Sequence, residues 1–224
     1  MYFKAVIFDL DDTLIDAHYA WKRGFQKTLA SIRHHMTESE FSRLYRMNSQ
    51  EIRNFIRDIY ESENLGGLMP FETVMDNLKS EMGRQYARDI QAKPYALEFV
   101  TALHRLGMPA CIATLTSRDL AEKTLTRLGF SPYLQFVITG DEVGASKTTA
   151  DIYLAAAKRL GFPPSDIVVF EDCQTAVRTA YMADFLVCRV ADQYQDRPVD
   201  ELNSYCHWRI TDYLDARRLI SQAA

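Results

Sequence analysis

This 224-residue sequence has no long apolar run and no cysteines at a metal-binding spacing. No apolar run approaches the roughly 18 residues that a membrane-spanning helix requires, so we expect no membrane partner. The opening residues, "MYFKAVIFDL", lack the length and the cleavage site of a signal peptide, which favours a cytoplasmic protein. The four cysteines form no CxxC pair, and we interpret them as small buried apolar residues in a reducing compartment.

A large excess of charge of one sign is missing as well. The formal net charge is −4, which gives the chain no general electrostatic attraction for nucleic acid, so we expect no nucleic-acid partner. The composition, 47% hydrophobic and 25% charged, is typical of a soluble globular protein. The length suits one large domain or one domain that carries an insertion, and no internal repeat divides the chain further.

The region 17–93 has the pattern of helices only. Apolar residues recur there at helical spacing, for example in the segment 52–60, and the residues "TESE" at 37–40 fit a capping box at the start of a helix. The segment "NLGGLMP" at 64–70 predicts a loop, with Pro70 placed to begin the next helix. We therefore expect an all-helical unit in this part of the chain.

The rest of the chain alternates between short apolar runs and helical patterns. The runs predict strands at 3–8, 109–114, 134–139, 167–170, 185–190 and near 207–211. The patterns between and after them predict helices at 95–106, 118–128, 150–160, 174–182 and the C-terminus. Such alternation indicates the α/β class, with a Rossmann-like parallel sheet flanked by helices. Because the helical region follows the first strand directly, we expect a core domain of residues 1–16 and 94–224 with an inserted helical cap domain of residues 17–93.

Polar side chains stand where the predicted strands end. Asp9 follows the first strand, and Thr114 ends the second. Glu171 and Asp172 follow the strand at 167–170, while Lys147 lies in the loop after the strand that ends near residue 139. In open parallel sheets, ligands bind at the carboxyl ends of the strands. We therefore expect these side chains to meet at one edge of the sheet.

Carboxylates that are gathered in one place must be protonated, paired or bound to a metal. The stretch "VIFDLDDTLID" at 6–16 supplies four of them, and the strand at 167–170 brings more. Mg²⁺ is the simplest counterion, since it prefers oxygen ligands and often binds one or two carboxylates together with phosphate oxygens. With a lysine and a hydroxyl nearby, the set would neutralise and orient a phosphoryl group.

Other interpretations of the aspartate cluster are weaker. A calcium-binding EF-hand loop starting at Asp9 would need glycine and glutamate where the sequence has Leu14 and Ala20, so we reject it. A solvated turn remains the plain alternative, and Asp12 fits it. Asp16 is placed to act as the N-cap of the helix that follows.

The chain resembles the haloacid dehalogenase (HAD) superfamily of phosphohydrolases across roughly residues 3–190. The first motif of that family, a strand followed by Asp-x-Asp-x-Thr, is matched by "DLDDT" at 9–13. Thr114 matches the second motif, Lys147 the third, and the acidic pair at 171–172 the fourth. The helical region resembles the family's small cap, and all four motifs occur in the family's order.

The resemblance implies a role for each matching residue. Asp9 would be the nucleophile that attacks phosphorus and forms an aspartyl-phosphate. Asp11 would protonate the leaving oxygen and then activate the water that hydrolyses this intermediate. Thr114 would donate a hydrogen bond to a phosphoryl oxygen, and Lys147 would hold Asp9 and the phosphoryl group by charge.

The resemblance also implies Mg²⁺ as the cofactor. Its ligands would be the carboxylates of Asp9 and Asp172 and the backbone carbonyl of Asp11, with Glu171 supporting them from outside the ligand set. Haloalkanoate dehalogenases of this fold lack an acid at the position of Asp11, because a halide leaves without a proton. The acid present here favours phosphoryl transfer.

We therefore expect a Mg²⁺-dependent phosphatase for a small phosphorylated metabolite, acting as a monomer because the cap already closes the site. Two alternatives remain open: a sugar phosphomutase of the β-phosphoglucomutase type, and a binding or regulatory protein without turnover. The cap would supply specificity. Its candidate contacts, each also explained as ordinary surface or packing, are His18, Trp21, Lys22, Arg43, Arg46, Arg53 and Arg57. We expect the pair His34-His35 to be solvated, and Trp208 and Tyr213 to pack in the core.

Overall fold

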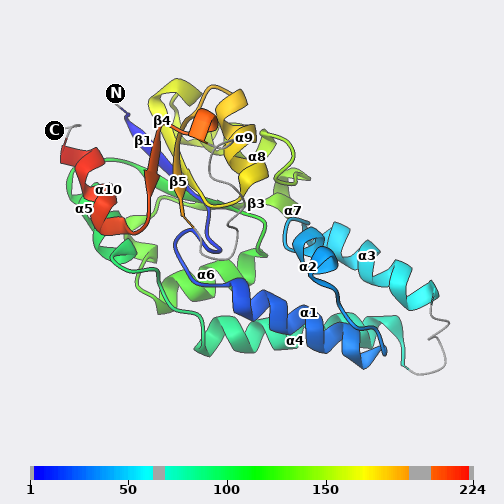
Figure 1. The fold of residues 1–224 in the computed structure, drawn as a ribbon. Coiled ribbons are helices and arrows are strands. Elements are labelled where there is room, and N and C mark those ends of the chain that lie inside the picture. Colours follow the sequence, from blue (N-terminus) through cyan, green and yellow to red (C-terminus); the bar gives the residue numbers. More distant parts are fainter. Residues whose placement is uncertain (1–2, 63–68, 192–202, 222–224) are drawn as a thin grey trace.

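The computed structural model describes residues 3–62, 69–191 and 203–221 (Figure 1). Its strands are β1 (Ala5–Phe8), β2 (Ala110–Thr114), β3 (Val137–Thr139), β4 (Ile167–Glu171), β5 (Leu186–Val190) and β6 (Trp208–Ile210). Its helices are α1 (His18–Ser31), α2 (Glu38–Leu44), α3 (Ser49–Ser62), α4 (Phe71–Arg88), α5 (Ala96–Arg105), α6 (Arg118–Arg127), α7 (Gly140–Val143), α8 (Asp151–Leu160), α9 (Gln174–Met182) and α10 (Tyr213–Ser221). Within the described ranges, none of these helices is both long and apolar enough to cross a membrane.

The six strands form one parallel sheet in the order β3-β2-β1-β4-β5-β6. Strand β1 lies at the centre, where Val6 is in register with Ala110 of β2 on one side and Val168 of β4 on the other. The predicted fold class is confirmed. The chain runs outward from β1 in both directions, so the crevice beyond the carboxyl ends of β1 and β4 is the expected ligand site of such a sheet.

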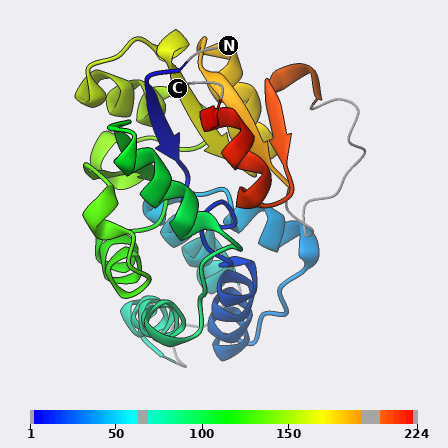
Figure 2. The ribbon, with the colours of Figure 1, turned by 90° about the vertical axis from the view of Figure 1, so that its left-hand side faces the viewer.

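Each face of the sheet has its own apolar core. Val6 and Phe8 of β1 point to the face that α5, α6 and α10 cover, whereas Ala5 and Ile7 point to the face that α8 and α9 cover. Figure 2 shows α5 and α10 in front of the sheet with α9 behind it. Because side chains alternate along a strand, a sheet buried on both faces needs continuous apolar strands, and all four residues of β1 are buried.

One element differs from the sequence-based expectation. The strand predicted at 134–139 is shorter, because residues 131–133 form a 3₁₀ turn and β3 spans only Val137–Thr139. As predicted, both C-terminal aromatic residues pack against the core: Trp208, on the edge strand β6, is partly buried, and Tyr213 is fully buried against Phe8 and Phe170. Most of the predicted loop at 64–70 lies outside the described residues.

Helices α1 to α4 lie between β1 and α5 in the chain and gather at one end of the sheet (Figure 1). Helices α1 and α4 pack side by side, and at Gly24 a Cβ atom would lie 2.5 Å from the Met82 sulfur, so any larger residue there would displace the Met82 side chain. We call residues 17–93 the helical insertion. The division of the chain into a core domain (1–16 and 94–224) and a cap domain (17–93) stays a prediction.

The predicted capping box starts helix α2. The Thr37 hydroxyl accepts a hydrogen bond from the Glu40 backbone N–H, and the Glu40 carboxylate accepts one from the Thr37 backbone N–H. Glu40 also lies 2.9 Å from the His34 ring, which is partly buried. The expectation that His34 is solvated was therefore wrong, because the capping carboxylate holds it; His35 is exposed.

Candidate active site

A cavity of about 510 Å³ lies between the carboxyl edge of the sheet and the helical insertion. Five sequence-predicted residues line it: Asp9, Asp11, Thr114, Lys147 and Asp172. Asp9 follows β1, Thr114 ends β2 and Asp172 follows β4, so parallel pairing brings three strand ends to the same place. The expectation that these side chains meet at one edge of the sheet is confirmed.

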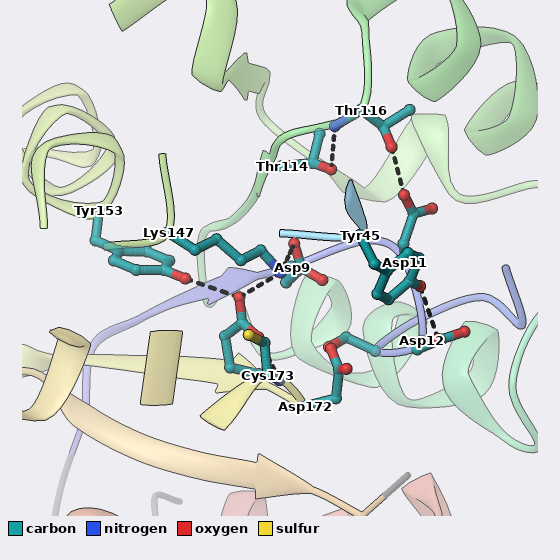
Figure 3. Close-up of polar contacts among 12 residues, drawn as sticks. Asp9, Asp11, Asp12, Tyr45, Thr114, Thr116, Lys147, Tyr153, Asp172 and Cys173 are labelled. Atoms are coloured by element: carbon teal, nitrogen blue, oxygen red, sulfur yellow. Dashed lines mark hydrogen bonds and ion pairs between the residues drawn. The ribbon is translucent and has the colours of Figure 1, made fainter. Parts of the chain in front are cut away.

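Lys147 joins two of the acidic strand ends (Figure 3). Its Nζ lies 3.0 Å from Asp9 Oδ1 and 2.9 Å from Glu171 Oε1, and all three side chains are buried or nearly so. Glu171 also accepts hydrogen bonds from the Tyr153 hydroxyl (2.8 Å) and the Cys173 backbone N–H (3.0 Å). Both Glu171 oxygens are thus engaged, which fits a supporting position behind Asp9.

The charges of this cluster depend on one another. Burial raises the pKa of the Asp9 carboxyl well above its usual value, and the Lys147 ammonium opposes that rise. Burial favours the neutral amine of Lys147, but the Asp9 and Glu171 carboxylates outweigh it and hold the pKa of Lys147 well above its usual value. Lys147 is therefore a fixed cation at neutral pH, and a further positive charge near Asp9 would keep that carboxyl ionised.

The donor set around Asp9 fits a hard divalent cation. One oxygen each from Asp9, Glu171 and Asp172 lie within 4.8 Å of one another. Asp9 Oδ2 is buried and has no hydrogen-bond partner among the described residues, while Asp172 Oδ1 accepts a 2.9 Å hydrogen bond from the Thr13 hydroxyl. Leaving a buried carboxylate oxygen without a partner is costly, and oxygen ligands at such spacing are those that Mg²⁺ prefers.

Asp11 points away from this cluster and is held by three donors. The Tyr86 hydroxyl donates to Asp11 Oδ1 at 2.7 Å, and the Trp21 ring N–H donates to Oδ2 at 3.0 Å. The Thr116 hydroxyl makes a further short hydrogen bond to Oδ2, shown in Figure 3. Burial raises the pKa of the Asp11 carboxyl, and the hydrogen bonds from Thr116, Tyr86 and Trp21 oppose the rise.

Sequence reasoning missed two of these donors. Tyr86 lies four residues after Met82, so it continues the buried stripe of α4, and that stripe was its only signal. Thr116 stands two residues beyond Thr114, and its backbone N–H donates to the Thr114 hydroxyl oxygen at 3.1 Å. Nothing in the spacing shows that either hydroxyl reaches Asp11.

Asp12, and not Asp16, caps the helix that follows them. Asp12 is fully buried in a left-handed turn (φ 57°), and its Oδ1 accepts hydrogen bonds from the backbone N–H groups of Ala17 and His18, both at 2.9 Å. Asp12 therefore caps α1, and the solvated-turn and N-cap expectations for Asp12 and Asp16 were wrong. Asp16 is exposed and lies 3.2 Å from Lys93 Nζ.

The candidate cap contacts divide into two groups. Four of them line the cavity: His18, Trp21, Arg43 and Arg46. The other three do not line it: Lys22, Arg53 and Arg57. Lys22 pairs with Glu38 at 2.7 Å, and the guanidinium groups of Arg53 and Arg57 lie over the Phe71 ring, so packing within the insertion accounts for all three.

Comparison with known families and proteins gives a consistent result. The family model of haloacid dehalogenase-like hydrolases matches residues 3–183. Protein CbbY of Rhodobacter capsulatus is 26% identical over 95% of this chain and 94% of its own length. A phosphorylated carbohydrates phosphatase of Thermotoga maritima is 27% identical over 80% of this chain and 81% of its own length.

Solved structures show the same fold. A hydrolase from Pseudomonas syringae superposes with a TM-score of 0.77 at 22% identity, covering 99% of both chains. CbbY of Rhodobacter sphaeroides in complex with xylulose-(1,5)bisphosphate superposes with a TM-score of 0.75 at 20% identity, covering 94% of this chain and 95% of that one. At such identities the likeness concerns the fold alone.

Proposed function

Because this chain belongs to the haloacid dehalogenase-like hydrolases, we propose that it is a Mg²⁺-dependent phosphatase of a small phosphorylated metabolite. The observation that carries the proposal is the meeting of Asp9, Asp11, Thr114, Lys147 and Asp172 in one cavity. A nucleophile, an acid, a hydroxyl, a fixed cation and an acidic oxygen cluster are the groups that phosphoryl transfer through an aspartate needs.

In the first step, Asp9 attacks phosphorus. A bond forms between an Asp9 carboxylate oxygen and phosphorus, the bond from phosphorus to the ester oxygen breaks, and that oxygen takes a proton from Asp11. Lys147 would neutralise the phosphoryl oxygens from its position 3.0 Å from Asp9 Oδ1. The Thr114 hydroxyl, buried at the end of β2, would donate to one of them.

In the second step, the aspartyl-phosphate is hydrolysed. Asp11, now ionised, takes a proton from a water molecule, and the water oxygen attacks phosphorus while the bond to Asp9 breaks. The products are inorganic phosphate and the free Asp9 carboxylate. One carboxyl thus serves as acid and then as base, which requires it to stand outside the metal-binding cluster, as Asp11 does.

The proposed Mg²⁺ ligands are the Asp9 and Asp172 carboxylates together with the Asp11 backbone carbonyl. The unpartnered Asp9 Oδ2 supports this choice, and the engagement of both Glu171 oxygens supports a role for Glu171 outside the ligand set. When bound, Mg²⁺ would offset the negative charge of the carboxylates and of the phosphoryl group.

The cavity favours a small polar substrate. Arg46 offers an exposed guanidinium at its wall, and Ser39 and Ser42 add polar groups beside it. Two relatives are a phosphorylated carbohydrates phosphatase and the fructose-1-phosphate phosphatase YqaB of Escherichia coli, so a sugar phosphate is the first class to test. We further propose a cytoplasmic monomer, because the insertion of the same chain borders the site and all four cysteines are free.

A phosphate-release screen tests the function. The panel contains sugar phosphates, nucleotides, phosphoglycolate and cofactor phosphates, each with Mg²⁺ and with a chelator. We expect Mg²⁺-dependent release with at least one substrate, and none from the Asp9→Asn variant. Conversion that needs a bisphosphate activator and frees no phosphate would instead establish a phosphomutase, and tight binding without turnover would establish a binding protein.

A further inference from the structure

We propose that Tyr86 and Trp21, two residues of the helical insertion, position the Asp11 carboxyl for proton transfer and so adapt the site to alkyl phosphates. The proposal rests on the proposed function, in which Asp11 is the acid. Both are positioning residues, because they act through Asp11 and not on the phosphoryl group. The insertion would then have a second task besides bordering the substrate cavity: it would aim the acid that the core supplies.

The hydrogen bonds to Asp11 define its orientation. A carboxylate offers about four acceptor positions. Thr116 and Trp21 donate to Oδ2, and Tyr86 donates to Oδ1. Three positions are therefore used, and one on Oδ1 is left over for the leaving oxygen or the attacking water. Asp11 lines the cavity, so we assign this remaining position to the proton exchange with a ligand there.

Tyr86 is held from both ends. Its backbone carbonyl accepts hydrogen bonds from Arg127 Nε (3.1 Å) and Nη2 (2.9 Å) and from the Thr124 hydroxyl (3.3 Å), all on helix α6. Its side chain is 1% exposed. Helix α6 therefore holds the end of α4, and with it the Tyr86 hydroxyl that contacts Asp11.

Trp21 completes the arrangement from helix α1. Its single ring N–H is shared between two acceptors, since Trp21 Nε1 lies 2.6 Å from the Tyr86 hydroxyl oxygen and 3.0 Å from Asp11 Oδ2. The Trp21 and Tyr86 rings meet edge to face with centroids 6.1 Å apart. Because indole nitrogen can only donate, Trp21 orients the Tyr86 hydroxyl so that its proton points to Asp11. Helices α1 and α4 pack side by side, so one pair of packed helices carries both aromatic residues.

The chemistry makes the proposal specific. The need for an acid grows with the basicity of the leaving oxygen: an alkoxide from a sugar or polyol must be protonated as it leaves, whereas nitrophenolate leaves without help. A misplaced Asp11 carboxyl should therefore slow the hydrolysis of alkyl phosphates far more than the hydrolysis of aryl phosphates. The three hydrogen bonds that fix the orientation of Asp11 therefore matter most if the substrates are alkyl phosphates, whose leaving oxygens need a proton.

The test compares Tyr86→Phe and Trp21→Phe with the wild type on two substrates, p-nitrophenyl phosphate and the best alkyl phosphate of the screen. We expect kcat for the alkyl phosphate to fall about tenfold or more, because general acid catalysis contributes roughly 10²–10⁴ and is only partly lost. For Tyr86→Phe, a residue outside the cavity lining, we expect kcat for p-nitrophenyl phosphate to fall less than about threefold, with KM nearly unchanged for both substrates.

Tyr60→Phe is the matched control. It removes a hydroxyl from the same insertion, one that donates to the Met69 carbonyl at 2.6 Å and does not line the cavity. Equal losses on both substrates, or a Tyr60→Phe variant that behaves like Tyr86→Phe, would show a merely structural role. Turnover of aryl phosphates alone by the wild type would overturn the assignment to alkyl phosphates.

Failure of the proposed function is distinguishable from failure of this inference. If the wild type releases no phosphate, or if Asp9→Asn keeps its activity, the phosphatase proposal fails and this one falls with it. Suppose instead that the wild type releases phosphate and Asp9→Asn is inactive. If Asp11→Asn then loses more activity on alkyl than on aryl phosphates, while Tyr86→Phe does not, only the positioning role is refuted. Thermal unfolding of each variant shows that it is folded.

Discussion

The Tyr45 hydroxyl, at the end of helix α2, donates a 2.7 Å hydrogen bond to Oδ2 of Asp12, in the turn that follows β1. Asp12 Oδ1 accepts hydrogen bonds from the backbone N–H groups of Ala17 and His18, where α1 begins. One buried carboxylate thus joins the turn after β1 to two helices of the insertion. Burial alone would raise its pKa, but the hydrogen bonds from His18 and Tyr45 hold the pKa of Asp12 below its usual value.

Replacing Tyr45 should weaken this link. We expect Tyr45→Phe to lower the free energy of unfolding by about 1.5 kcal/mol at pH 7, because a hydrogen bond to an ionised carboxylate is lost. The pKa of Asp12 is depressed in the folded state, so its contribution is present above the unfolded value of about 3.9 and is lost as pH falls below it. Urea unfolding at several pH values measures both effects.

Tyr95→Phe is the control for that experiment, since Tyr95 is 46% exposed. Equal unfolding free energies for the two variants at pH 7 would contradict the linking role of Asp12. A deficit of Tyr45→Phe that does not shrink at any pH below the unfolded value would show that the bond does not depend on an ionised carboxylate.

Lys147→Ala should damage activity and stability together. The variant leaves Asp9 and Glu171 facing one another without the ammonium that lies about 3 Å from each. Breaking a buried ion pair costs about 3–5 kcal/mol, and losing a charged group beside the phosphoryl oxygens costs about 10²–10³ in kcat. Urea unfolding and phosphate release measure the two losses.

The stability deficit of Lys147→Ala should shrink as pH is lowered, because unpaired buried carboxyls have raised pKa values and are stabilised by taking up protons. Lys4→Ala is the matched control: Lys4 pairs with Asp166 at 2.9 Å on the exposed surface, and such a pair contributes about 0–1 kcal/mol. If both lysine variants lost the same stability, Lys147 would not be the partner of buried carboxylates.

The sequence predicts the part of the site that the sheet builds. Asp9, Thr114 and Asp172 each follow or end an apolar run, and parallel strands bring such ends together whatever the details of packing. The same reasoning does not predict the role of Tyr86, because its hydroxyl contacts Asp11 only as a result of how α4 packs against α6. Helical spacing shows that Tyr86 is buried but not what it touches.

Asp12 and Asp16 illustrate a second limit. Both are acidic residues shortly before a helix, and Asp16 is the nearer of the two to the start of α1. The cap is Asp12 because the chain turns through a left-handed conformation there (φ 57°), which carries its side chain back to the N–H groups of Ala17 and His18. A positive φ at a non-glycine residue depends on the fold around it and leaves no periodic signal.

Mg²⁺ binding should be visible without turnover. We expect millimolar Mg²⁺ to raise the thermal unfolding midpoint of the wild type, since a ligand at 100 times its dissociation constant stabilises by about 2.7 kcal/mol. Asp172→Ala should abolish the shift, because it removes a carboxylate next to the unpartnered Asp9 Oδ2. Asp166→Ala, a change far from the cluster on the pair with Lys4, should keep it. A shift that survives in Asp172→Ala would place the ion elsewhere.

Glu81 of α4 should stabilise the insertion in a pH-dependent way. Lys27 of α1 donates to its Oε1 at 2.7 Å, and Gln85 donates to the same oxygen at 3.0 Å. These hydrogen bonds lower the pKa of Glu81 to about 2. We expect Glu81→Gln to lower the free energy of unfolding by about 1 kcal/mol at pH 7, because Lys27 is half exposed and solvent weakens the pair.

A depressed folded-state pKa fixes the direction of the pH effect for Glu81. Its contribution is present above the unfolded value of about 4.3 and disappears as pH falls toward the folded value of about 2. Roughly half of the difference between Glu81→Gln and the wild type should therefore be gone at pH 3. Glu72→Gln is the control, since Glu72 pairs with Arg53 at the surface, where its side chain is 68% exposed. A Glu81→Gln deficit that stays constant from pH 7 to pH 3 would show that the side chain acts by packing and not by its charge.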